Sequence, residues 1–294
     1  MTTPVAGIAR SSILVDLFIS TYSGRKLDRK TQEEVTNSKG AASKRAASVS
    51  KHLFADCKEL DDITKFQAAA RQTHYKLTLP WSDSGTRLIP AAKFLEYKER
   101  MTKHEEEFND LVEKFLVKYD TLVAAAAFQL GTLFDRDEYP TREQVRRKFS
   151  FNVAVMPMPT SGDFRLDIEN EVQQELIDAY EERIATQVNG AMRDAWDRLH
   201  AVLTRISDRL TVETDGTKRK FHDTLVTNAD ELCELLTTLN VTQDPALERA
   251  RARLNDALLG VSPNELRKED STRAEVKQKV DAILNDFDWG LADE

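Results

Sequence analysis

The sequence predicts a mainly α-helical protein of the α+β type, with a small antiparallel sheet near the N-terminus, long helices, and a helical bundle in the C-terminal half. Apolar residues recur at helical spacing across residues 91–130 and again across 167–210. Of 294 residues, 31% are charged, but only 10 are Gly and 8 are Pro, which favours long solvated helices. Only three segments, near 12–22, 75–89 and 149–156, have strand character.

The first strand is predicted from strict alternation. Ile13, Val15, Leu17 and Ile19 occupy every second position, and Ser23-Gly24 then provides a turn. Beyond this turn, helix-compatible sequence covers 28–34. The following residues, 37–51, are small and basic and lack the large apolar side chains of a buried face. We therefore interpret 37–51 as a mobile or partner-contacting segment.

A short helix over 61–72 and a hairpin over 75–89 come next. Tyr75, Leu77 and Leu79 read as the entering strand, 80–85 supplies the Pro, Asp, Ser and Gly of a turn, and 87–89 leaves it.

The helix predicted over 91–130 carries a seam with a seven-residue repeat. The seam residues are Phe94, Met101, Phe108, Phe115 and Leu122. This spacing is typical of a coiled coil. His104 and Lys118 interrupt the seam, so a globular bundle containing one long helix is the alternative interpretation.

A short basic helix (142–148) and a strand (149–156) end the N-terminal half, and 160–163 has the composition of a linker. We therefore expect an α+β domain over 1–160, a helical domain over 161–285 and an acidic tail over 286–294.

The C-terminal half is predicted to be entirely helical. A long amphipathic helix covers 167–210, and three shorter helices cover 218–239, 245–258 and 263–284. Asp244 and Ser262 precede prolines at the starts of the last two helices, where they suit N-caps.

Charge is distributed unevenly along the chain. The net charge is −8, yet residues 25–51 hold eight basic and three acidic residues, a local charge of +5. The basic residues are Arg25, Lys26, Arg29, Lys30, Lys39, Lys44, Arg45 and Lys51. Such a segment can contact nucleic acid or an acidic protein, and an ordinary solvated face is the alternative.

The tail combines aromatic and acidic residues. We expect Phe287 and Trp289, flanked by Asp286 and Asp288, to dock on a partner protein or on a second copy of the chain. The competing interpretation is that Trp289 packs on the end of its own helix.

Sequence motifs for catalysis are absent. The sequence has no Gly-rich phosphate loop, no Gly-x-Ser-x-Gly elbow and no Cys or His pairs at zinc-ligand spacing. We therefore expect no enzyme activity, no catalytic residues, no metal and no cofactor. The longest apolar run, 122–128, is too short to span a bilayer, and we expect a cytoplasmic protein whose Cys57 and Cys233 are buried thiols.

The run Val15-Asp16-Leu17-Phe18-Ile19-Ser20-Thr21-Tyr22-Ser23-Gly24-Arg25-Lys26-Leu27, followed by Ser38-Lys39-Gly40, resembles the opening of a family from phages, prophages and plasmids. That family is labelled only as a domain of unknown function. The resemblance extends through 94–119. Family members usually carry Trp where Tyr22 stands here, and an apolar, Gly-rich hairpin in place of 80–85. Their genes often lie near those of a MoxR-type AAA+ ATPase and a von Willebrand A-like protein, so the resemblance implies a phage accessory protein with an ATPase partner.

Three functional hypotheses follow. The leading one is a non-enzymatic, self-associating phage accessory protein that acts as an adaptor or scaffold, for an AAA+ ATPase, in the host bacterial cytoplasm. The second is a protein that binds or anneals single-stranded DNA through the basic segment. The third is a phage inhibitor that blocks a host defence complex.

Overall fold

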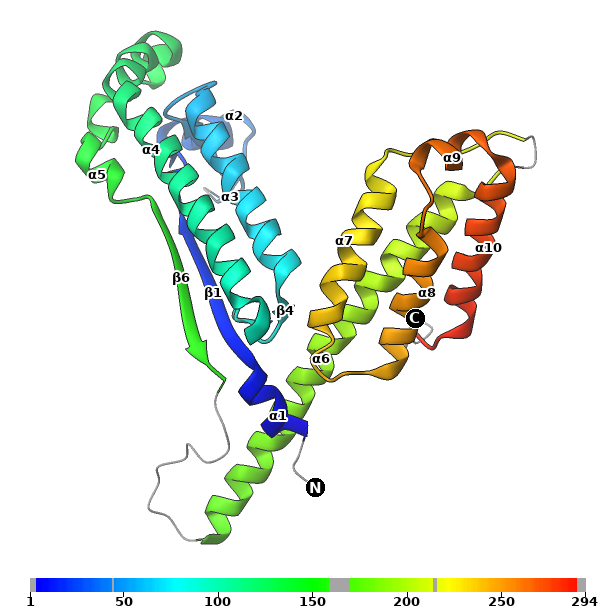
Figure 1. Cartoon of the computed structure of the whole chain (residues 1–294). Coiled ribbons are helices and arrows are strands. Elements are labelled where there is room, and N and C mark those ends of the chain that lie inside the picture. Colours follow the sequence, from blue (N-terminus) through cyan, green and yellow to red (C-terminus); the bar gives the residue numbers. More distant parts are fainter. Residues whose placement is uncertain (1–3, 44, 159–169, 214–215, 290–294) are drawn as a thin grey trace. The chain divides into compact units, whose positions relative to one another are not determined.

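A computed structural model describes residues 4–43, 45–158, 170–213 and 216–289. It confirms the predicted fold class, since helices dominate and the strands form one small sheet and one two-stranded ribbon (Figure 1). Among the described helices, none is both long enough and apolar enough to cross a membrane.

The helices are α1 (Pro4–Ser11), α2 (Arg29–Ser38), α3 (Lys58–Leu77), α4 (Phe94–Leu130), α5 (Arg142–Arg146), α6 (Asn170–Leu210), α7 (Thr224–Leu239), α8 (Pro245–Leu258), α9 (Pro263–Lys268) and α10 (Asp270–Asp286). The strands are β1 (Ser12–Ser20), β2 (Arg25–Leu27), β3 (Ser50–His52), β4 (Leu79–Pro80), β5 (Arg87–Pro90) and β6 (Ser150–Pro157).

The larger sheet has the strand order β4-β5-β1-β6. Strand β5 is antiparallel to both β1 and β4, with Ile13 opposite Ile89 and Leu14 opposite Leu88. The second sheet is the antiparallel pair β2 and β3, in which Lys26 lies opposite Lys51.

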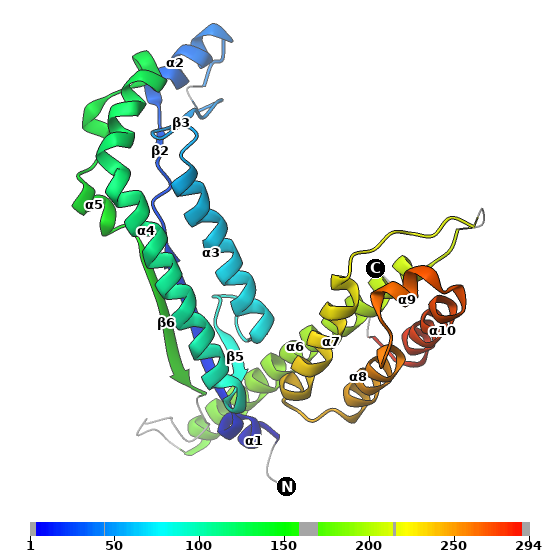
Figure 2. The same ribbon diagram turned by 45° about the horizontal axis from the view of Figure 1, so that its top comes forward.

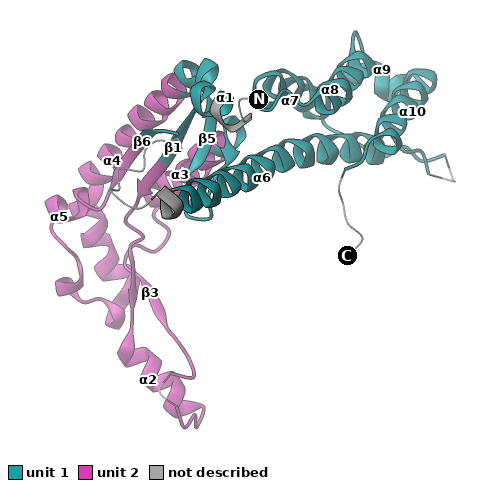
Figure 3. Cartoon of the chain, turned by 90° about the horizontal axis from the view of Figure 1, so that it is seen from below, with its two compact units in different colours: residues 1–16, 75–97, 155–294 teal, residues 17–74, 98–154 magenta. Residues whose placement is uncertain are grey.

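The chain forms two compact units, each assembled from separate stretches (Figure 3). Unit 1 contains residues 1–16, 75–97 and 155–294, and unit 2 contains 17–74 and 98–154. The sequence instead predicted contiguous domains with a linker at 160–163, a segment that lies outside the described residues. Contacts of α1 and β4 with α6, and of β5 with α7, explain why N-terminal residues belong to unit 1.

The core of unit 2 is an aromatic cluster on α4. Phe54 packs edge-on against Phe115 at 5.9 Å between ring centroids and lies 5.6 Å from Tyr119, while Phe108 contacts Phe151 at 5.8 Å. Burial also raises the pKa of Tyr119. The middle of the seven-residue seam of α4 is therefore buried within its own chain, as the globular alternative requires.

In unit 1, α6 packs against α7 and α10, and α8 packs on α7 and α10. Helix α6 also caps the C-terminal end of α3. Arg198 of α6 donates to the carbonyl oxygens of Tyr75 (3.0 Å), Lys76 (2.9 Å) and Thr78 (2.7 Å). The last carbonyls of a helix have no partners within the helix, so these bonds satisfy the end of α3.

Some predicted boundaries were wrong. The strand assigned to Tyr75 and Leu77 is the last turn of α3, because buried Ile63, Ala70, His74 and Leu77 keep a helical spacing along one face. The helix predicted from 218 begins at Thr224, and the one predicted over 263–284 is interrupted at Glu269, whose backbone is extended.

The N-caps proposed from sequence are confirmed. Asp244 accepts a 2.8 Å hydrogen bond from the Ala246 amide, and Ser262 forms a reciprocal capping box with Glu265.

Candidate interaction surfaces

The basic segment folds into an arm that we define as residues 25–52, the basic arm. Strands β2 and β3 pair at its base, and α2 lies at its far end within unit 2 (Figure 3). Gly24 directly precedes the arm with φ +59, and a Cβ there would lie 3.1 Å from Leu60 and 3.2 Å from Phe54. Glycine therefore permits both the left-handed turn and the close packing beneath the arm.

Asp28 fixes helix α2 to the base of the arm. Its side chain accepts hydrogen bonds from the Thr31 amide (3.1 Å) and the Thr31 hydroxyl (3.0 Å), and its own amide donates to Val49 (2.9 Å). The amide of Thr31, with its hydroxyl and nearby Lys51, holds the pKa of Asp28 below its usual range. The carboxylate thus caps α2 where the helix dipole favours a negative charge.

Most of the predicted contact residues of the basic arm are exposed. Exposed positions are Arg25, Lys26, Arg29, Lys30, Lys39 and Arg45. Apart from Lys26, which lies 3.7 Å from Glu138, none of these six forms an ion pair with a described residue. Lys44 lies outside the described residues. The exposed cations are therefore available to an anionic partner.

Lys51 differs from the other cations of the basic arm. Its ammonium lies 2.6 Å from the Glu138 carboxylate and donates to the Leu133 carbonyl at 2.8 Å, and its side chain is only 10% exposed. Lys51 therefore anchors the base of the arm to the segment after α4.

The basic residues around α5 are largely occupied. Arg146 forms a two-pronged ion pair with Glu113, Arg147 lies 3.6 Å from Glu143, and Lys148 lies over the ring of Tyr22. Three basic residues of the short helix predicted over 142–148 therefore have intramolecular partners.

The aromatic residues of the tail pack on α6. Trp289 is buried, donates its indole N–H to the Leu284 carbonyl at 2.8 Å, and packs edge-on against Trp196 at 5.4 Å. Phe287 lies 6.1 Å from the same ring. This is the competing interpretation of the tail, and docking of these rings on a partner stays a prediction that would require them to leave Trp196. Residues 290–294 lie outside the described part.

Strand β6 presents an open edge. It pairs with β1 on one side, and in the described chain no strand lies along its other side (Figures 1 and 2). Its sequence, Ser-Phe-Asn-Val-Ala-Val-Met-Pro, contains no charged residue, and five of its eight residues are exposed. Natural proteins usually protect such edges with charges or covering elements, and this uncharged edge leaves its backbone groups open to another strand.

The profile of a family described as "Protein of unknown function (DUF3150)" matches residues 10–226. The chain belongs to this family. The match extends from the end of α1 through α6 to the start of α7, so it includes the basic arm, α4 and β6. No curated protein and no solved structure matches the chain.

Metal-ligating side chains and the two cysteine thiols are groups that can support chemistry. No group of three or more metal-ligating side chains occurs among the described residues. Both thiols are free and buried, and burial raises the pKa of Cys57 and raises that of Cys233 to about 11. Neutral, buried thiols are weak nucleophiles.

Sequence reasoning missed a cavity lined with cations from α6, α9, α10 and residues 218–222. The run Lys218-Arg219-Lys220 was the available signal. It was not recognised because the other cations are distant in sequence.

Proposed function

We propose that this chain is a non-enzymatic, self-associating adaptor or scaffold, and that two copies pair through β6. The observation that carries the proposal is the uncharged open edge of this strand. An unpaired edge offers a row of backbone donors and acceptors to another strand, and side chains on alternate positions supply specificity.

A second copy of β6 is the occupant that fits this edge best. Two identical strands related by a twofold axis pair antiparallel and place equivalent side chains near one another. If the strand carried charged residues, this arrangement would place like charges opposite each other and destabilise the pairing. Strand β6 has no such charges, and Phe151, Val153 and Val155 give it an apolar face.

The adaptor role rests on the basic arm as a second surface. Its exposed cations suit an acidic protein partner, while β6 pairs the copies. The resemblance noted in the sequence adds the context of a phage accessory protein, with an AAA+ ATPase as the partner.

The test is the molar mass of the full chain in solution, measured by multi-angle light scattering over a concentration series. We expect a dimer for the native chain and a monomer for Asn152→Lys/Val155→Lys, because the substitutions bring like charges together. Val117→Lys is the matched control, since Val117 is exposed on α4, and it should remain dimeric. A native chain that stays monomeric at the highest concentration would contradict the proposal.

Nucleic-acid binding by the basic arm is the second candidate. Five of its exposed cations lack an ion pair with any described residue, and lysines and arginines that neutralise phosphates bind single strands in a salt-dependent way. Phe54 is buried, so it offers no platform for base stacking.

Fluorescence anisotropy with a labelled single strand tests this candidate. Binding should weaken steeply with salt, and Arg25→Ala/Arg29→Ala/Lys30→Ala/Lys39→Ala should lose it. The double variant Arg183→Ala/Arg249→Ala, at exposed arginines outside the arm, should bind as the native chain does. Absence of binding at low salt would remove nucleic acid as the partner of the arm.

A further inference from the structure

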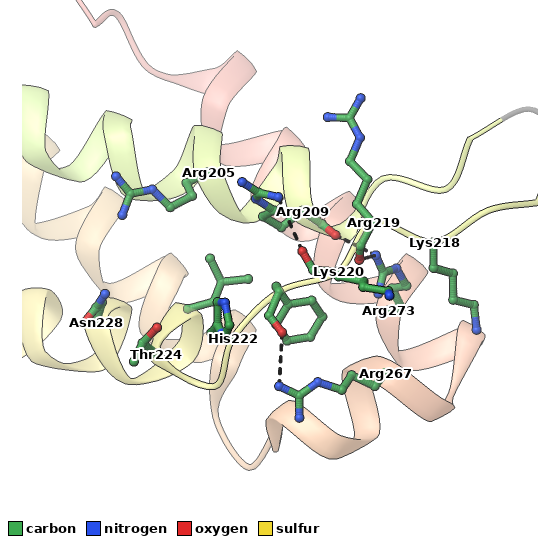
Figure 4. Close-up of a pocket in the computed structure, with 12 residues that line it drawn as sticks. Arg205, Arg209, Lys218, Arg219, Lys220, His222, Thr224, Asn228, Arg267 and Arg273 are labelled. Atoms are coloured by element: carbon green, nitrogen blue, oxygen red, sulfur yellow. Dashed lines mark hydrogen bonds between the residues drawn. The ribbon is translucent and has the colours of Figure 1, made fainter.

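The C-terminal end of α6 borders a cavity of about 910 Å³ that lies entirely within unit 1 (Figure 4). Residues 218–222 cross it, and α7, α9 and α10 complete its walls. Seven of the residues that line it are arginine or lysine, one is His222, and none is acidic. The seven cations are Arg205, Arg209, Lys218, Arg219, Lys220, Arg267 and Arg273.

The cavity is built around a buried guanidinium. Arg273 is 2% exposed and donates to the carbonyl oxygens of Leu210 (2.9 Å), Arg209 (2.6 Å), Arg219 (3.1 Å) and Leu266 (3.3 Å). These bonds tie the end of α6 to residues 218–222 and to α9. Carbonyls satisfy the donors but do not neutralise the charge, and Arg273 has no carboxylate ion pair within the described chain.

Two more arginines hold the crossing segment in place. In Figure 4, Arg209 and Arg267 approach residues 218–222 from opposite sides. Arg209 donates to the Lys220 carbonyl at 3.4 Å, and Arg267 donates to that of Phe221 at 3.2 Å. The cavity wall is therefore held by side-chain contacts from α6 and α9.

The positive charge is only partly neutralised. Four of the seven cations pair with carboxylates that do not themselves line the cavity: Arg209 and Arg219 with Asp208, Arg219 also with Glu213, Arg267 with Asp223 and Lys218 with Asp270. Arg205, Lys220 and Arg273 form no ion pair with a described carboxylate. Among the described residues, seven cations against four carboxylates leave an excess of three positive charges.

We propose that this cavity binds a small molecule that carries two or more phosphate groups. The cations converge from separate elements on a partly open cavity whose volume is within the range of small-molecule sites. Arginine suits phosphate because its planar guanidinium donates two parallel hydrogen bonds. A bound polyanion also offsets the charge of Arg273.

The surrounding carboxylates favour a compact ligand over nucleic acid. Asp208, Glu213, Asp223 and Asp270 surround the cations, so a long polyanion that extended past the cavity would meet negative charge. A short oligophosphate fits inside this boundary. Phe221 already has Arg267 at 5.0 Å and Arg273 at 5.7 Å from its ring centroid, so phosphate groups supply the recognition without base stacking.

Isothermal titration calorimetry on the full chain tests the proposal, with tripolyphosphate, ATP and adenosine as probes. Tripolyphosphate and ATP should bind, and adenosine should not. Arg205→Ala/Lys220→Ala removes the two unpaired exposed cations and should weaken binding at least about tenfold, because hydrogen bonds to charged groups are lost. Circular dichroism should report an unchanged fold, since neither side chain forms a hydrogen bond or an ion pair with a described residue.

The matched control is Arg183→Ala/Arg249→Ala, which removes two exposed arginines of unit 1 outside the cavity and should retain native affinity. Equal loss in both double variants would mean that general electrostatic attraction explains binding, and the site would be rejected. The proposal also fails if tripolyphosphate does not bind, or if a single-stranded oligonucleotide binds more tightly and the Arg205→Ala/Lys220→Ala variant loses that binding. A monomeric native chain would remove the β6 proposal while leaving these results unchanged.

Discussion

At the scale of single residues, the buried guanidinium of Arg273 donates to four backbone carbonyls. Replacing Arg273 by Met keeps much of its length but leaves four backbone carbonyls without their donor. We expect the free energy of unfolding in urea to fall by about 3 kcal/mol, the scale for leaving buried polar groups unpaired. Arg249→Met, at an exposed position on α8, should change it little. Similar urea midpoints for the two variants would refute this role.

Lys51 illustrates how similar residues in one basic segment have different roles. Removing its side chain by Lys51→Met leaves Glu138 with only the more distant Lys26, so we expect a loss of about 2 kcal/mol in unfolding free energy. Lys39→Met, at an exposed position, should be neutral in the same urea titration. The reverse ranking of the two variants would show that the arm is anchored elsewhere.

At the scale of elements, the segment after α10 is stabilised by its contact with α6. Trp289→Ala removes the ring that packs on Trp196 and the donor to the Leu284 carbonyl. Large-to-small changes of this kind cost about 3 kcal/mol or more. The midpoint temperature of thermal unfolding should therefore fall for Trp289→Ala. It should not fall for Asn285→Ala, because Asn285 is exposed at the end of α10. Unchanged stability would instead support the prediction that the ring is free to dock on a partner.

The elements that the sequence predicted well are those whose signal is local and repeated. Strand β1 alternates, and α4 and α6 keep apolar residues on one face over many turns. The entering strand of the hairpin was wrong because Tyr75, Leu77 and Leu79 alternate as a strand does, while the buried face of α3 continues through Leu77. For so short a segment, contacts such as those from Arg198 decide the conformation.

At the scale of the whole molecule, local sequence patterns did not predict the features that combine distant parts of the chain. The cation-lined cavity joins Arg205 to Arg273 across 68 positions, and the two compact units combine separate stretches. Exposure on the basic arm was anticipated from its composition, but the anchoring of Lys51 by Glu138 depends on tertiary structure. Tertiary contacts, unlike periodicity, leave no repeated mark in the sequence.

The response of the whole chain to acid follows from its carboxylates. Several have pKa values below the ordinary 4.5 of Glu because of a nearby cation, as with Glu59 beside Lys118, Glu113 beside Arg146 and Glu248 beside Arg251. A carboxylate with a lowered pKa in the folded state stabilises the protein above its unfolded-state pKa, and this stability is lost as the pH falls through the folded-state value. Burial raises the pKa of Asp230, and a raised carboxylate pKa has the opposite effect on the pH dependence of stability. One such group is outnumbered by the carboxylates whose pKa is lowered.

The midpoint temperature of thermal unfolding should therefore change little from pH 7 to pH 5. It should then fall progressively from about pH 4.5 downward, where these carboxylates become protonated. Lys118→Met provides the matched test, because removing the cation returns the pKa of Glu59 toward its ordinary value. The variant should be less stable than the native chain at pH 7, and the gap should close as the pH falls through the lowered pKa of Glu59 in the folded state. The Lys118 side chain of this ion pair is exposed, so the stability difference between the variant and the native chain should also shrink at high salt. A gap that widened on acidification would mean that Lys118 stabilises the fold by something other than its charge.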